Sequence, residues 1–162
     1  MKIRHGPKRR TTITVLYPEL AKNNIIDRTI NELRITRGEV AYRIDMIIGE
    51  AELPAFCTYR NPFYNNAIRE RILGKTVTFL VIVGDDIMER TRKVVGIQQN
   101  PNDWIPTTIN GKFWREFDWK TLTSVDGKKF YPRPVDCALT YTAVKRWIRF
   151  LAPRLNQSKL VS

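Results

Sequence analysis

Apolar and β-branched residues gather in three runs that have the length and period of β-strands. Residues 11–17 (TTITVLY) are β-branched and aromatic, which favours a strand. From Val40 to Ile48, apolar residues alternate with mainly polar ones, the period of a half-buried strand. Residues 76–83 (TVTFLVIV) form a continuous apolar run, which predicts a central strand covered on both faces.

Three other segments carry the signals of helices. Residues 24–33 place Ile26, Ile30 and Leu33 on one helical face. Residues 62–73 follow the capping residue Asn61 and have Pro62 at the first helical position. Gly74 ends this helix. Residues 138–151 (ALTYTAVKRWIRFL) are amphipathic and basic, and Pro153 closes them.

Between the central strand and the last helix, the pattern indicates turns and short strands. Gly84 and the two aspartates that follow it predict a turn, and a strand is expected through Val94, Val95 and Ile97. The pairs Asn110-Gly111 and Asp126-Gly127 suit two-residue hairpin turns. We therefore expect two hairpins between residues 99 and 134.

Together these elements predict an α+β fold: a single domain with a mainly antiparallel sheet and two or three packed helices. A chain of 162 residues with 43% apolar residues suffices for one compact domain that buries about 70% of its unfolded surface. We expect a flexible basic arm over residues 1–10, a globular domain over 11–153 and a basic tail over 154–162.

The excess of positive charge is concentrated at the two ends of the chain. The net charge is +12, of which +5 lies in the first ten residues and +5 in residues 137–162. No apolar run reaches the roughly 20 residues of a membrane-spanning helix, and the first residues lack the apolar centre of a signal peptide. An intracellular or virion location is expected.

The basic ends predict binding to an anionic partner, either nucleic acid or a nucleocapsid, by neutralisation of phosphate charge without base recognition. An anionic membrane surface is an alternative partner, because a basic amphipathic helix with Trp147 and Phe150 suits a headgroup layer. Charge that only improves solubility is the third interpretation. The candidate binding residues are Lys2, Arg4, Lys8, Arg9, Arg10, Lys145, Arg146 and Arg149.

An aromatic segment supplies the second candidate surface. If it is a strand, Phe113, Arg115, Phe117 and Trp119 share one face. Such a face packs into a core or a subunit interface, and self-association is therefore expected; stacking on exposed bases is the alternative.

Histidine and cysteine chemistry has few participants. His5 is the only histidine, and Cys57 and Cys137 lack metal-ligand spacing. Two buried free thiols in a reducing compartment are expected, with no cofactor. Carboxylates at Asp85, Asp86 and Glu89, and at Glu50 and Glu52, follow predicted strands. A metal-dependent nuclease that uses Asp85, Asp86 and Glu89 is the alternative function, although an aspartate pair beside glycine is first a turn signal.

The basic segment MKIRHGPKRR, followed directly by a β-rich domain, resembles small viral coat and matrix proteins. That resemblance covers the organisation of residues 1–17 and implies a protein without enzymatic activity. It would neutralise a genome or nucleocapsid with its arm and self-assemble through its folded part.

Overall fold

The structure is a computed structural model that describes residues 10–98, 100–157 and 159–160. Residues 1–9, and with them Lys2, Arg4, Lys8 and Arg9 of the expected arm, lie outside the described residues. The division into an arm, a domain and a tail stays a prediction.

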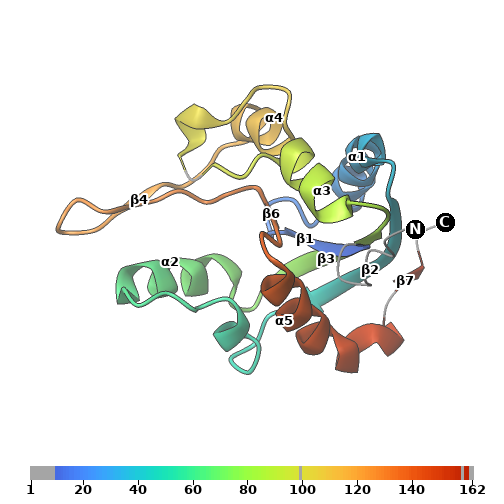
Figure 1. The fold of residues 1–162 in the computed structure, drawn as a ribbon. Helices are drawn as coiled ribbons and strands as arrows, with labels where there is room; N and C mark the ends of the chain where they lie inside the picture. Colours follow the sequence, from blue (N-terminus) through green and yellow to red (C-terminus); the bar gives the residue numbers. More distant parts are fainter. Residues whose placement is uncertain (1–9, 99, 158, 161–162) are drawn as a thin grey trace.

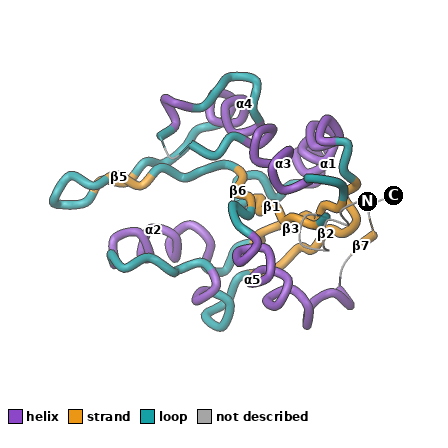
Figure 2. Tube along the Cα trace, in the orientation of Figure 1, coloured by secondary structure: helices purple, strands orange, loops and turns teal. Residues whose placement is uncertain are grey.

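The expected α+β class is confirmed (Figures 1 and 2), with more helices than the pattern indicated. The strands are β1 (Thr11–Leu16), β2 (Glu39–Ile47), β3 (Thr76–Val83), β4 (Leu122–Thr123), β5 (Lys129–Phe130), β6 (Val135–Cys137) and β7 (Lys159–Leu160). The helices are α1 (Asn23–Leu33), α2 (Pro62–Ile72), α3 (Ile87–Val95), α4 (Ile109–Glu116) and α5 (Tyr141–Leu151).

Five strands form an antiparallel sheet in the order β6-β1-β3-β2-β7. The apolar run at β3 lies at the centre, as predicted, with β1 and β2 on either side. Leu80 and Ile82 of β3 face one core and Phe79 faces the other. The period-two geometry of a strand thus explains why an uninterrupted apolar run was needed there.

Helices cover both faces of this sheet (Figure 1). Helices α1, α3 and α4 pack on one face, where Ile26, Ile87 and Phe113 are buried. Helices α2 and α5 lie on the other face, where Ile72 and Trp147 are buried. Each face therefore has its own apolar core.

Two expectations about residues 87–117 are wrong. The strand expected through Val94 and Val95 belongs to α3, because Ile87, Thr91 and Val95 are buried at helical spacing. The hairpin expected at Asn110-Gly111 is the first turn of α4, where Thr108 caps the helix by accepting from the amide of Gly111. The second hairpin is confirmed, since β4 and β5 pair around Gly127 at φ 84°.

Candidate functional site

A cleft of about 710 Å³ opens beside β6, at the edge of the sheet. Helix α2 and the β4–β5 hairpin extend beyond the sheet on the same side (Figure 1). Lys120, at the base of the hairpin, pairs with Glu70 of α2 at 2.9 Å. The lining comes from α2, β5, β6, the start of α5 and the loop before α2.

Aromatic rings form one part of the cleft wall. The rings of Tyr59 and Tyr64 lie 5.5 Å apart between centroids, and Phe130 and Tyr131 come from the hairpin. Tyr59 is 56% exposed, so its ring is accessible from the cleft. These rings offer flat apolar surfaces to a planar ligand.

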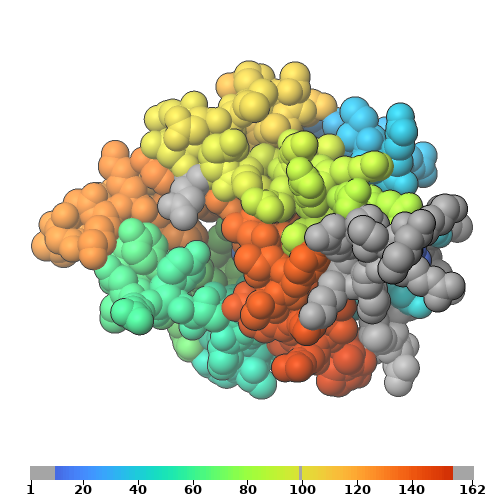
Figure 3. Space-filling model, viewed as in Figure 1, coloured from blue at the N-terminus to red at the C-terminus, as the bar shows by residue number. Residues whose placement is uncertain are grey.

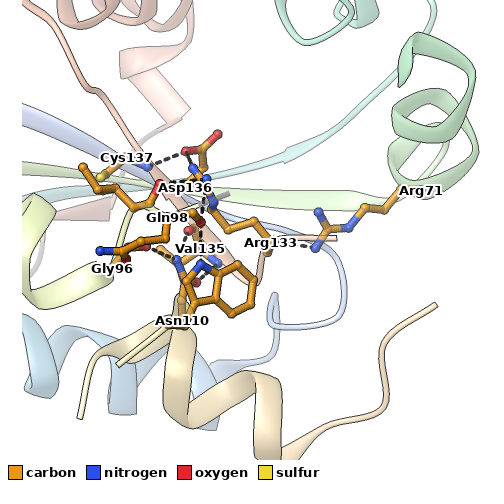
Figure 4. A network of polar contacts seen from close by, with 10 residues as sticks. Arg71, Gly96, Gln98, Asn110, Arg133, Val135, Asp136 and Cys137 are labelled. Atoms are coloured by element: carbon orange, nitrogen blue, oxygen red, sulfur yellow. Dashed lines mark hydrogen bonds and ion pairs between the residues drawn. The ribbon is translucent and has the colours of Figure 1, made fainter. Parts of the chain in front are cut away.

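Two arginines hold the inner part of the cleft in place (Figure 4). The guanidinium of Arg71 forms a bidentate pair with Glu19 at 2.9 and 3.1 Å, lies over the ring of Tyr17 and donates to the carbonyl of Arg133. Arg133 donates to the carbonyls of Ile97 and Gln98. The donors of both guanidinium groups are thus committed largely to partners within the protein.

Asp136 is the only carboxylate that lines the cleft among the described residues. Its Oδ1 accepts from Arg133 at 3.2 Å and from the backbone amide of Cys137 at 2.9 Å. Its Oδ2 has no hydrogen bond to a described residue, and the side chain is 40% exposed. One carboxylate oxygen therefore remains open to the cleft.

The buried side chain of Asn110 secures the backbone of β6 (Figure 4). Its Oδ1 accepts from the amide of Val135 at 2.8 Å, while its Nδ2 donates to the carbonyls of Val135 and Gly96 at 2.9 and 2.7 Å. Because every one of these partners is main chain, Asn110 fixes the strand that carries Asp136.

Burial shifts the titration of several groups around the cleft. It raises the pKa of Cys137 to about 12, with the nearby Asp136 acting in the same direction. It also raises the pKa of the Tyr17 and Tyr59 phenols, again with help from Asp136. These three groups therefore stay protonated and neutral at pH 7.

Two cations in the lining are open to solvent. Lys129 lies on β5 and Arg146 on α5, and both are exposed. The guanidinium of Arg146 lies 5.5 Å from the centroid of the Trp147 ring. Neither side chain forms an ion pair with a described acidic residue, so both can bind an anionic ligand without breaking such a pair.

A second cavity, of about 620 Å³, lies around α3. Its charged lining is balanced, with Asp86 and Glu89 against Arg92 and Lys93, and Lys93 pairs with Glu89 at 3.6 Å. We place the candidate site in the cleft beside β6, because only there do cations exceed carboxylates.

The carboxylates proposed for a nuclease do not gather into a metal site. Asp85 is 82% exposed and pairs with Arg10 at 3.8 Å, while Asp86 precedes α3 in a left-handed conformation. Glu50 pairs with Arg69 and Glu52 with Arg154. In the part of the chain that the structure describes, no group of three or more potential metal ligands is found.

Among the predicted basic residues that the structure describes, Arg146 alone lines the cleft. Lys145 and Arg149 are exposed on α5 outside the lining. Arg10 continues the chain before β1, where its carbonyl accepts from the amide of Gly84. A role for these residues in binding nucleic acid was not tested and stays a prediction.

The aromatic set does not form a strand face, because Phe113 and Arg115 belong to α4 and Phe117 and Trp119 follow its end. Phe113 is 1% exposed and belongs to the core, so it has no surface for an external base. Phe117 and Trp119 pack partly buried against the same core, and Trp119 donates to the carbonyl of Phe113. Arg115 donates to the carbonyl of Gly111, one turn earlier in the helix.

Sequence reasoning missed most of the cleft. Its residues come from separate segments, and Asp136 stands in a three-residue strand without any motif around it. The available signal was local enrichment: residues 129–133 (KFYPR) combine two cations with two aromatic rings.

No family model matches the sequence, and no curated protein matches it either. Solved structures do share its fold. A nucleoside diphosphate kinase family protein from Babesia bovis superposes with a TM-score of 0.69 at 13% identity, covering 94% of this chain and 93% of that one.

Two further solved structures agree. A nucleoside-diphosphate kinase from Borrelia burgdorferi, a transition-state mimic with bound vanadate and ADP, has a TM-score of 0.67 at 18% identity over 86% of this chain and 84% of its own. A kinase of the same name from Pyrobaculum aerophilum has a TM-score of 0.67 at 16% identity, over 87% of this chain and 94% of its own.

These likenesses correct the expected function. The resemblance to viral coat or matrix proteins was wrong, because the proteins that share this fold are nucleoside-diphosphate kinases. The expectation of a protein without enzymatic activity and the nuclease alternative are overturned by the same finding. The positive charge at the chain ends indicates a preference for anionic partners and carries no information about the fold. It therefore could not identify the class of protein.

No helix among the described residues has both the length and the apolar character needed to cross a membrane. The sheet has an edge at β2 through which two copies of the chain could associate. Outside the two residues that pair with β7, the outer edge of β2 has no strand partner in the described part of the chain, and such edges can pair between copies. Self-association remains a prediction that sedimentation would test.

Proposed function

We propose that the cleft beside β6 binds nucleoside di- and triphosphates, and that the protein transfers a phosphoryl group between them. The observation that carries this proposal is the combination of accessible aromatic rings and unpaired cations in one cleft. The kinase fold supports it, as does the ADP bound to the Borrelia burgdorferi enzyme.

The aromatic wall would hold the base. Tyr59, Tyr64, Phe130 and Tyr131 line the cleft, and stacking on an aromatic side chain contributes about 1–3 kcal/mol per base in other proteins. Because every base has a π-face, this arrangement predicts a site that accepts several bases.

Lys129 and Arg146 would bind the phosphates. Both are exposed in the lining, and a guanidinium can donate two parallel hydrogen bonds to one phosphate. Phosphoryl transfer depends mainly on positioning and on stabilisation of the developing negative charge. Cations already fixed at the cleft would supply that stabilisation without reorganising during the reaction.

A matched pair of variants on α5 tests the binding site. We expect Arg146→Ala to weaken ADP binding about tenfold, the loss of roughly 1.4 kcal/mol when a charge-assisted contact disappears. Arg149→Ala removes the same charge from the same helix, three residues beyond Arg146 and outside the lining. It should leave the affinity within about twofold, because exposed distant charges are screened.

Titration calorimetry with ADP and the full chain would measure both affinities. If both variants weaken ADP binding equally, the affinity depends only on the net charge of α5, and the assignment of Arg146 to the phosphates is wrong. Absence of ADP binding by the folded wild-type protein would refute the proposed function.

A further inference from the structure

We infer that Asp136 is the nucleophile that receives the phosphoryl group, so that the reaction passes through an aspartyl phosphate on the enzyme. This inference rests on the proposed function and assigns the reacting atom within the same cleft.

The cleft offers few groups that can attack phosphorus at neutral pH. Among the described residues there is no histidine. Cys137 is buried as a neutral thiol, and thiols react as thiolates. The phenols of Tyr17 and Tyr59 are also neutral at this pH, because a tyrosine titrates at about pH 10 and the pKa of both is raised further. Asp136 is the only carboxylate in the described lining, and its Oδ2 is open toward the cleft.

The geometry of Asp136 suits attack. Arg133 and the amide of Cys137 both bind Oδ1, which fixes the orientation of the carboxylate. Oδ2 has no hydrogen bond within the described structure, and the side chain is 40% exposed. The attacking oxygen is therefore positioned without being blocked, and carboxylates are known to act as covalent nucleophiles toward phosphate.

The surroundings reduce the repulsion between a carboxylate and a triphosphate. Arg133 lies 3.2 Å from Oδ1, and the exposed cations Lys129 and Arg146 line the same cleft. Asn110 fixes β6 through two hydrogen bonds to the main chain of Val135. The carboxylate is thus held on a rigid strand beside positive charge, which favours precise positioning of reacting atoms.

The chemistry balances in two steps. Oδ2 of Asp136 attacks the terminal phosphorus of a nucleoside triphosphate, an Asp–O–P bond forms, and the bond from that phosphorus to the bridging oxygen breaks. The nucleoside diphosphate leaves with the electron pair. A terminal oxygen of a second nucleoside diphosphate then attacks the same phosphorus, and the carboxylate is released unchanged.

The test follows label on the full-length protein after incubation with Mg²⁺ and γ-labelled GTP. We expect one labelled site at Asp136, cleaved by hydroxylamine and by alkali as acyl phosphates are. Mass spectrometry after reduction by borohydride should find homoserine at position 136. Initial rates with GTP and ADP should give the parallel lines of a ping-pong mechanism.

Asp136→Asn keeps the size of the side chain and an oxygen that can accept from Arg133. We expect this variant to bind ADP within about threefold of the wild type, but to lose the label and at least a hundredfold of the exchange rate. Asp27→Asn is the control, because Asp27 is exposed on α1 and lies outside the lining. It should label and exchange like the wild type.

Different failures have different meanings. Label on another residue, equal label on Asp136→Asn, or exchange with intersecting initial-rate lines and no label would overturn the inference and leave the proposed function standing. Absence of both ADP binding and exchange in the folded wild-type protein would overturn both.

Discussion

Asp136 and Cys137 are neighbours in β6 with opposite surroundings. Successive side chains of a strand point to opposite faces, so Cys137 enters the core at 6% exposure while Asp136 faces the cleft. Sequence reasoning predicted two buried free thiols, which is confirmed for Cys137, whereas Cys57 is free but only partly buried. It did not select Asp136, because a lone aspartate carries no spacing signal, and only folding brings Arg71 and Tyr17 into the same cleft.

The buried thiol predicts how stability depends on alkaline pH. Burial raises the pKa of Cys137 to about 12, whereas an unfolded chain titrates a thiol near pH 8.5. Above that pH the unfolded state loses a proton that the folded state retains. The free energy of unfolding should therefore fall by about 1.4 kcal/mol per pH unit until the folded thiol titrates.

Urea denaturation between pH 8 and 11 would measure this slope. Cys137→Ala should reduce the slope and leave a remainder, because the raised pKa of Tyr17 acts with the same sign. Cys57→Ala should change it less, since Cys57 lies nearer the surface. An unchanged slope in Cys137→Ala would contradict the assignment of the effect to this thiol.

Among the elements, those with long uniform patterns were predictable and those that depend on packing were not. The β3 run and the capped α2 follow from sequence because local signals agree with the final environment. Asn61 caps α2 by accepting from the amide of Phe63 at 3.0 Å. Helix α4 forms despite the hairpin signal at Asn110-Gly111, because Asn110 bonds to the distant Gly96 and Val135 and Gly111 lies against the carbonyl of Ile105.

Gly111 gives a test of that explanation. A helical glycine replaced by alanine normally gains about 1 kcal/mol of stability. Here an added Cβ would lie 2.1 Å from the carbonyl oxygen of Ile105, a backbone atom that cannot turn aside. We expect Gly111→Ala to lower the free energy of unfolding by about 1–3 kcal/mol, as other overpacked sites do.

Urea denaturation at pH 7 would measure the change. Asn66→Ala is the matched helical control, because Asn66 is exposed in α2 and alanine should be neutral or slightly stabilising there. A Gly111→Ala variant as stable as the wild type would show that α4 does not depend on close approach to Ile105.

Over the whole molecule, charge and fold carry separate information. The net charge of +12 indicated an anionic partner, and polynucleotide and nucleotide phosphates satisfy that indication equally. The proposed function favours small nucleotides, because exposed cations and aromatic rings line one cleft. The cleft is lined by residues of β6, α2, α5 and the β4–β5 hairpin, which are separate in the sequence. Figure 3 shows the hairpin lying beside α2 on the surface.

The most direct test of this account is transfer of label from γ-labelled GTP to ADP by the purified full-length protein. Phosphoryl transfer in this cleft predicts labelled ATP in proportion to the protein added, and slower formation by Arg146→Ala prepared in the same way. Failure of the folded wild-type protein to form labelled ATP above the rate without protein would contradict the assignment of phosphoryl transfer to this cleft.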